Sequence, residues 1–244
     1  MKASKFLLYS TFLVSLVLLV SPVLAGPSAR VQAPNREWVE EVFIDYSHAG
    51  PGPHPTTESD NFHLTQGGMK WFAGGNVEYR VTGAEATAGG NTAIEAAEAT
   101  VDGFITTRIF SRDDATTQTN PCTGQPNTVH WASIDGEGDV LATASVCRNV
   151  ATKAIGGFVI TIDTDDSWST TGSSTAFDVQ NALTHEWLHV GGLDHTNAPQ
   201  DGCLTSYRLA DLGETQKRTL GLGDKLGMNV LYSSSDVTAG SCGS

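Results

Sequence analysis

Three histidines and one glutamate are spaced in this sequence as a catalytic metal site requires. His185 and His189 lie four residues apart, so on a helix both imidazoles share one face and can bind one metal ion. Glu186 follows the first histidine, where its carboxylate can hold a bound water. Gly192 lets the backbone turn, so that His195 can return as a third ligand. Three neutral nitrogens leave zinc a fourth position for water, which predicts one catalytic zinc ion.

The same residues match the long metzincin signature H-E-x-x-H-x-x-G-x-x-H without a substitution. The chain around them resembles the matrix metalloproteases (matrixins) and their bacterial relatives, from about residue 68 to residue 232. The resemblance is strongest at 177–184, before the signature, and at 192–196, after it. Thr196 follows the third histidine, where the related astacins carry a glutamate. This resemblance implies an α+β fold with a metzincin-like twisted mixed β-sheet, an active-site helix and a C-terminal helix.

The resemblance also implies a function, that of a zinc metalloendopeptidase. A zinc-bound water activated by Glu186 would hydrolyse peptide bonds of a protein or peptide substrate. That substrate would add as an extended strand to an edge strand of the sheet. The predicted substrate-binding residues are Leu141, Ala142, Thr143 and Ala144 in this edge strand, and Tyr207 in the wall of the pocket.

Two other functions compete with this prediction. The chain could be a non-catalytic, zinc-containing extracellular binding or adhesion domain, or a zinc hydrolase that acts on something other than a peptide. Glu186 argues against the binding domain, because loss of this base is the simplest route to inactivity. The resemblance of residues 141–144 to the family's edge strand favours a peptide substrate.

The sequence departs from the family pattern in three places. The family's methionine turn is expected near Cys203, so either Cys203-Leu204 replaces the methionine or Met228 serves from farther along; we favour the first. The histidine that holds the family's second zinc is replaced by Thr143, so no second zinc is expected. No cysteine precedes Cys122, so the family's cysteine-based latency cannot operate.

The remaining patterns predict the elements that must hold the site. Alternation and β-branched residues predict strands near 76–81, 108–110, 128–134, 140–147 and 157–162. Helical spacing predicts helices over 91–107, over a segment capped by Ser173, Ser174 or Thr175 that ends at Gly191-Gly192, and over 224–232. Strands followed by a helix, more strands and two helices are typical of an α+β domain.

The first 25 residues have the pattern of a secretory signal peptide. Lys2 and Lys5 precede a mostly apolar run from Phe6 to Val20, and Ala25 ends a plausible cleavage site. An uncleaved anchor helix is the alternative, but no basic stop-transfer cluster follows. We therefore expect a secreted, extracellular protein without a stable membrane anchor.

Two further regions follow the predicted signal peptide. Residues 26–67 are either an N-terminal arm or a short pro-segment, and contain one strand-like stretch from Trp38 to Tyr46. Residues 68–244 form the predicted zinc metalloprotease catalytic domain, which we expect to be a monomer.

The charge of the chain limits its partners. Without residues 1–25 it has 12 basic and 27 acidic residues, a net charge of −15. Such a surface repels phosphate backbones, so no nucleic-acid partner is expected. Calcium is a secondary cofactor prediction, for which the candidate groups are Asp135, Glu137 and Asp139, or Asp163, Asp165 and Asp166.

Four cysteines predict two disulfides in an oxidising compartment. Three pairings are possible, and we favour Cys122–Cys147 and Cys203–Cys242, because each joins residues on the same side of the histidine cluster. A thiolate zinc site is the alternative, but the sequence has no C-x-x-C spacing.

Overall fold

The computed structural model describes residues 37–48, 58–72, 75–105, 109–234 and 238. Its strands are β1 (Trp38–Ser47), β2 (His63–Leu64), β3 (Val77–Thr82), β4 (Phe110–Arg112), β5 (Thr128–Ala132), β6 (Val140–Asn149), β7 (Ile155–Asp163), β8 (Trp168–Ser169), β9 (Phe177–Asp178), β10 (Leu193–Asp194) and β11 (Leu209–Ala210). Its α-helices are α1 (Gly90–Asp102), α2 (Val179–Val190) and α3 (Leu222–Tyr232). Three short 3-10 helices are η1 (Thr65–Gly67), η2 (Pro199–Asp201) and η3 (Gln216–Arg218). The predicted signal peptide lies outside the described residues.

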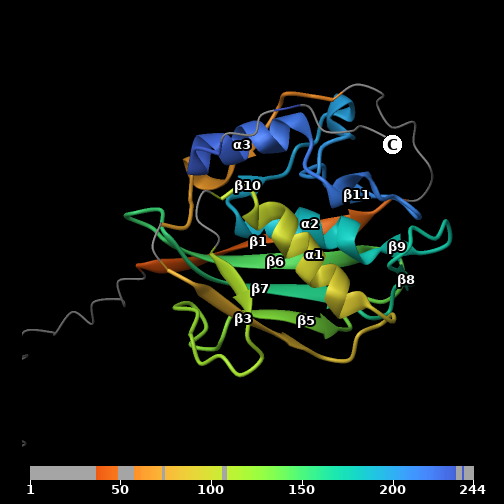
Figure 1. Ribbon diagram of the computed structural model, residues 1–244, viewed down its shortest axis with the longest axis horizontal. Helices are drawn as coiled ribbons and strands as arrows, with labels where there is room; N and C mark the ends of the chain where they lie inside the picture. The colour runs from red at the N-terminus through yellow and green to blue at the C-terminus, as the bar shows by residue number, and fades with distance from the viewer. Residues whose placement is uncertain (1–36, 49–57, 73–74, 106–108, 235–237, 239–244) are drawn as a thin grey trace, which may run out of the picture. The chain divides into compact units, whose positions relative to one another are not determined.

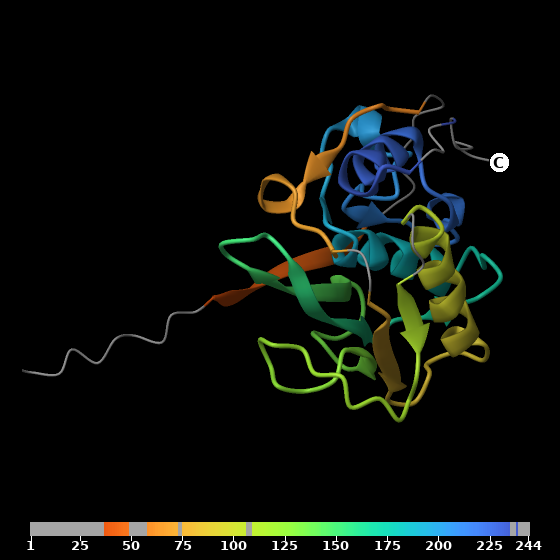
Figure 2. The same cartoon turned by 60° about the vertical axis from the view of Figure 1, so that its left-hand side comes forward.

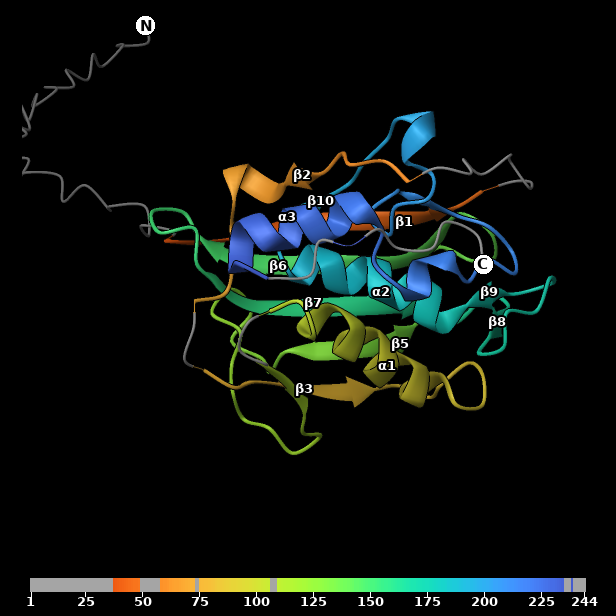
Figure 3. The same ribbon diagram turned by 45° about the horizontal axis from the view of Figure 1, so that its top comes forward.

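The largest sheet of the structure is mixed and has seven strands, in the order β11-β1-β6-β7-β5-β3-β4. Figure 3 shows its central strands from β1 to β3 one beside the next. The pairs of β3, β4, β5 and β7 are parallel, whereas β6 runs antiparallel to both of its neighbours. The α+β class and the mixed sheet predicted from the sequence are confirmed.

One prediction about this sheet is wrong. The sequence predicts an unpaired edge strand that contains Leu141, Ala142, Thr143 and Ala144. These residues belong to β6, which lies inside the sheet between β7 and β1. β1 pairs with β6 over nearly its whole length, from Trp38 opposite Asn149 to Tyr46 opposite Val140. The stretch Trp38 to Tyr46 is thus a strand as predicted, and its backbone covers the edge that the sequence alone leaves open.

The helices α1 and α2 lie side by side against the same face of the sheet (Figure 1; Figure 2 shows the same face from another direction). The core between them and the sheet is aromatic. Trp187 of α2 has no exposed surface, and its ring lies 5.0–5.1 Å from those of Tyr79, Phe110 and Phe158. Because these rings come from β3, β4 and β7, they fix α2 across several strands at once.

The two ends of α2 are set by polar and glycine residues. Its N-cap is Asp178, whose Oδ1 accepts a hydrogen bond from the Asn181 amide at 3.0 Å, so the predicted caps at Ser173, Ser174 or Thr175 are wrong. At the other end Gly192 adopts a φ of +102°, and a β-carbon there would lie 2.2 Å from the Met69 carbonyl oxygen. The turn that leads the chain away from α2 therefore requires glycine, as expected from Gly191-Gly192.

The other predicted elements agree with the structure apart from their ends. α1 stops at Asp102, before the predicted end at residue 107, and α3 begins two residues before the predicted start at 224. The disulfide Cys122–Cys147 is present and joins the loop before β5 to β6. Cys203 is also disulfide-bonded, and Cys242 lies outside the described residues. No helix in the described part of the chain is long and apolar enough to cross a membrane.

Candidate metal centre

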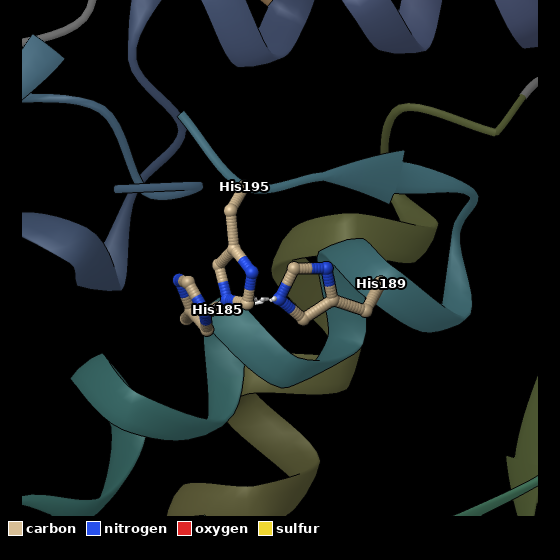
Figure 4. A group of neighbouring side chains, drawn as sticks. All are labelled: His185, His189 and His195. Atoms are coloured by element: carbon tan, nitrogen blue, oxygen red, sulfur yellow. Dashed lines mark hydrogen bonds between the residues drawn. The ribbon is translucent and has the colours of Figure 1, made fainter. Parts of the chain in front are cut away.

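Three histidines meet at one point beside the C-terminal half of α2. His185 and His189 lie one turn apart on the helix and are fully buried, and His195 follows β10 in the returning chain. Figure 4 shows the three rings turned toward one another. Their Nε2 atoms lie 3.0–3.1 Å apart. The sequence spacing thus predicted correctly which histidines come together.

The donor geometry of this cluster fits a zinc ion. The Nδ1–H of His185 donates to the Thr205 carbonyl at 2.6 Å, and that of His189 donates to the Leu193 carbonyl at 2.8 Å. In these two rings the Nε2 atoms then carry lone pairs, which face each other and need a cation between them. Two nitrogens bound to tetrahedral zinc at 2.0–2.1 Å are separated by about 3.3 Å, close to the spacing found here.

The surroundings keep all three imidazoles neutral, as metal ligands must be. Burial lowers the pKa of His185 and His189 well below the ordinary value, and the neighbouring histidines lower both further. The pKa of His195 falls to about 4, again mainly because of burial. Among the described residues, these histidines are the one group of three or more metal-ligating side chains whose ligand atoms lie within 4.8 Å of one another.

Glu186 is a buried carboxylate without a partner. Its side chain has no exposed surface, and neither carboxylate oxygen has a hydrogen bond with any of the described residues. Burial raises its pKa well above the ordinary value, and the charge of Asp45 raises it further. Burial of a carboxylate without a hydrogen-bond partner lowers the stability of the folded protein. This arrangement therefore indicates a site where the carboxylate would bind a water, an ion or a substrate group.

The same site contains two residues of β1 that sequence reasoning missed. Phe43 lies flat on the ring of His189, with the ring centroids 4.2 Å apart and the planes 6° from parallel. Asp45 is fully buried on the same face of the strand, and burial raises its pKa to about 7. The alternation of the strand placed both side chains on one face. No local pattern indicated which face would meet the histidines, because that depends on where β1 pairs.

A comparison with known protein families shows what this site resembles. The matrixin family model matches residues 123–233, a segment that contains all three histidines and Glu186. Over this segment, which is less than half of the chain, the protein resembles the matrixin family of metzincins. No curated protein matches the chain in a sequence comparison. The family is one of zinc metallopeptidases that act on peptides or proteins, in agreement with the resemblance found in the sequence.

In this matrixin-like chain the support beneath the histidines comes from the segment that begins at Cys203. The Thr205 carbonyl of this segment accepts the hydrogen bond from His185. The carboxylate of Asp224, at the start of α3, accepts from the Thr205 amide at 2.6 Å and from the Ser206 amide at 3.1 Å. Met228 instead packs at the end of α2, 3.3 Å from where Gly191 would carry a β-carbon. The Cys203 segment is therefore the one whose backbone holds a ligand ring.

Tyr207 belongs to a segment that leads from this support to β11. Its carbonyl accepts a hydrogen bond from the Lys217 ammonium at 2.6 Å, and the carbonyl of Leu209 accepts a second one at 2.5 Å. Lys217 is fully buried, and its charge acts on both Glu186 and Asp45. This buried cation is a second feature that the sequence did not reveal, because Gln216-Lys217-Arg218 has the composition of an exposed turn.

The predicted calcium groups remain predictions. Asp163, Asp166, Asp135 and Glu137 interact through their charges, and Asp166 accepts a hydrogen bond from the Gly138 amide at 3.0 Å. Burial raises the pKa of Asp166 to about 6, and the neighbouring acidic groups raise it further.

Proposed function

We propose that this chain is a secreted zinc endopeptidase in which His185, His189 and His195 hold the ion and Glu186 is the general base. One observation carries the proposal: three Nε2 atoms converge beside a fully buried carboxylate that has no partner among the described residues. A purely structural zinc would need a fourth protein ligand and would have no use for such a carboxylate.

Each of these residues has a distinct task. When bound, zinc would polarise the scissile carbonyl and lower the pKa of the attacking water. Glu186 accepts the proton of that water and passes it to the leaving amine. The carbonyls of Thr205 and Leu193 hold His185 and His189 in the tautomer that leaves Nε2 free for the metal.

The substrate of this proposed enzyme is a protein or peptide in extended conformation. Residues Leu141, Ala142, Thr143 and Ala144 of β6 would pair with its backbone once β1 has left them, and Tyr207 would line the wall beyond the scissile bond. The disulfide Cys122–Cys147 supports an extracellular location, since such bonds persist in oxidising compartments. We further propose that the protein acts as a monomer without a membrane anchor.

Replacement of Glu186 tests the catalytic role directly. The chain from Gly26 onward is purified as wild type and as Glu186→Ala, loaded with zinc, and incubated with casein with and without a chelator. We expect one zinc per chain in both proteins, and a rate that is about 10²–10⁴-fold lower in the variant, because the general base is lost while all ligands remain. The matched control is Glu95→Ala, which removes an exposed glutamate of α1 that pairs with Arg112 and should cleave like wild type.

The outcome separates the enzyme from a zinc-containing binding or adhesion domain. Equal cleavage by wild type and Glu186→Ala would contradict the proposed mechanism. A folded, zinc-loaded wild type that cleaves no casein would instead support the binding domain.

A further inference from the structure

The third histidine of the metal centre is held differently from the other two. His185 and His189 lie on α2, and their Nδ1 atoms donate to the carbonyls of Thr205 and Leu193. His195 lies outside the helix and is less deeply buried. Its ring makes no hydrogen bond with the described residues apart from the close contacts among the Nε2 atoms. The position of this ligand therefore depends on the backbone that carries it.

The backbone that leads to His195 is paired with a segment far earlier in the chain. β2 runs antiparallel to β10, with His63 opposite Asp194 (Figure 3). Beyond this pair, the Thr65 amide donates to the Gly192 carbonyl at 3.0 Å. β2 and the residue that follows it thus accompany the turn from the end of α2 to the residue before the ligand.

The side chain of His63 extends this pairing to the ligand itself. Its Nδ1 lies 2.8 Å from the carbonyl oxygen of His195. Because a carbonyl oxygen can only accept, Nδ1 of His63 carries the hydrogen and donates it. On the other side of the ligand, the Asp194 carboxylate accepts from the His195 amide at 2.8 Å. Both peptide groups of His195 are therefore held by side chains, one from each of the two paired strands.

The segment that carries His63 is anchored by contacts outside the metal centre. The side chains of Ser59 and Asn61 donate to the carboxylate of Asp201 at 2.7 and 2.9 Å. The Ser59 carbonyl accepts from the Gly223 amide of α3 at 3.0 Å. A β-carbon on Gly223 would lie 1.9 Å from the Asn61 carbonyl oxygen, so this close approach requires glycine. His63 thus projects from a fixed segment, as a residue that positions another must.

We propose that His63 is a positioning residue of the metal centre, which fixes the third ligand, His195, through the carbonyl of that ligand. This inference rests on the proposed function, since it concerns the same three ligands. It also assigns residues 59–67 to the catalytic unit, whereas the sequence leaves them in an arm or a pro-segment. A ligand outside the helix has more freedom to lose on binding, so a hydrogen bond that fixes its backbone favours the complete metal site.

Loss of this hydrogen bond should leave the metal-free fold intact. His63 is exposed, so its replacement creates no cavity, and water can take the place of its donor at the carbonyl of His195. His130 supplies a matched control. Its Nδ1 also forms one hydrogen bond, with the Thr82 hydroxyl at 2.7 Å, between β3 and β5, which carry none of the three ligands.

The test compares substitutions of similar size in the full chain. His63→Leu removes the donor, whereas His63→Asn keeps a donor close to the position of Nδ1. His130→Leu and His130→Asn are the controls. Thermal melting of the metal-free proteins first establishes that each is folded. Zinc affinity is then measured by competition with a chromophoric chelator, and cobalt(II) replaces zinc in a second sample, because its visible spectrum reports the ligands.

We expect His63→Leu to melt like wild type without metal, to bind zinc about tenfold more weakly and to change the cobalt spectrum. His63→Asn should recover most of the affinity and the wild-type spectrum, and both His130 variants should match wild type. Zinc binding by His63→Leu within about twofold of wild type overturns the proposal, as does His63→Asn that binds no better than His63→Leu. Metal-free His63→Leu that melts well below wild type also overturns it, because the residue would then act in folding.

Neither measurement depends on catalysis, so the two proposals can fail separately. If His63→Leu weakens zinc binding as expected but Glu186→Ala cleaves casein like wild type, the positioning role stands and the endopeptidase mechanism fails. If Glu186→Ala abolishes cleavage while His63→Leu binds zinc like wild type, the mechanism stands and the positioning role fails.

Discussion

The carboxylate of Asp178 connects the start of α2, the helix that carries His185 and His189, to the rest of the candidate site. Its Oδ1 caps α2 by accepting from the Asn181 amide, and the same oxygen accepts from Nε of Arg218 at 2.8 Å. The side chain of Asp178 is fully buried, and its other oxygen lies 2.5 Å from Nη2 of Arg218. Asn181 in turn accepts from the amide of Lys217 at 2.8 Å. One carboxylate thus fixes both α2 and the segment that carries the buried lysine.

Replacement of Asp178 by alanine should destabilise the protein by about 2–4 kcal/mol. The change removes an N-cap, which costs about 1 kcal/mol, and leaves Arg218 without its partner in a partly buried position. Asp178→Asn should lose less, because its side-chain oxygen can still cap the helix. Urea unfolding of the three metal-free proteins measures these differences.

A matched surface pair provides the control for this prediction. Asp114 also pairs with an arginine, Arg112, at 2.7 Å; the two arginines are similarly exposed, but the side chain of Asp114 is 53% exposed whereas that of Asp178 is fully buried. Asp114→Ala should therefore change the free energy of unfolding by less than about 1 kcal/mol. A loss at Asp178 no larger than the loss at Asp114 would contradict the role of the buried pair.

At the scale of single residues, the sequence predicts what depends on local spacing. The histidines and Glu186 sit within eleven consecutive residues, so helix geometry and one glycine turn are sufficient to bring them together. Asp45 and Lys217 could not be predicted in this way. Asp45 precedes His185 by 140 residues, and Lys217 follows His195 by 22 residues. Only the pairing of β1 and the fold of the segment after η2 bring their charges to Glu186.

Among the elements, β6 is the strand that positions β1 in the sheet. It separates β1 from the parallel part of the sheet, and the disulfide Cys122–Cys147 ties it to the loop before β5. Cys147 has no exposed surface, so the bridge is anchored inside the sheet. The bridge should stabilise the strand against which both β1 and a substrate would pair.

Loss of this bridge should cost about 3 kcal/mol of unfolding free energy. The two cysteines are 25 residues apart, and a cross-link of this span restricts the unfolded chain by about that amount. Cys122→Ala/Cys147→Ala is measured by urea unfolding against wild type. The single variant Cys122→Ala should lose nearly as much, because the cross-link is absent in both; a loss below about 1 kcal/mol in either variant would show that the bridge adds little.

The positions of the helices and strands along the chain were largely predictable from the sequence. The pairing of the strands with one another in the sheet was not. Alternation and β-branched residues indicated every long strand, including Trp38 to Tyr46, because these patterns report the burial of one strand face. Which strands are neighbours depends on pairing between segments about a hundred residues apart. For that reason the sequence predicts residues 141–144 at the edge of the sheet, and it predicts only that Trp38 to Tyr46 lies in an N-terminal arm or a short pro-segment.

At the scale of the whole molecule, acidic residues dominate, and some of them gather where β5 and β7 end. The acidic residues around Asp166 are Asp135, Glu137 and Asp163, and all three raise its pKa. Asp166 itself is almost completely buried, and one of its oxygens has no hydrogen bond with the described residues. In the folded protein the ionised form of Asp166 is thus less favourable than in the unfolded chain.

The burial of Asp166, together with the acidic residues around it, predicts a fall in the free energy of unfolding as the pH rises from about 4 to about 6. The pKa of Asp166 is about 6 in the folded protein and 3.8 as its ordinary value, so the unfolded chain loses its proton first and is favoured in this interval. Below pH 4 both states are protonated, and above pH 6 the loss is complete. After solvent screening, the expected contribution is about 1 kcal/mol.

Asp166→Asn isolates this contribution, because asparagine has nearly the same shape and no charge. Urea unfolding of wild type and variant at pH 4, 5, 6 and 7, in buffer without divalent cations, gives the difference in free energy at each pH. Relative to wild type, the free energy of unfolding of the variant should rise between pH 4 and pH 6, and the difference should persist at pH 7. A difference that does not change with pH would mean that Asp166 titrates in the folded protein as it does in the unfolded chain, and that the acidic residues around it do not oppose folding.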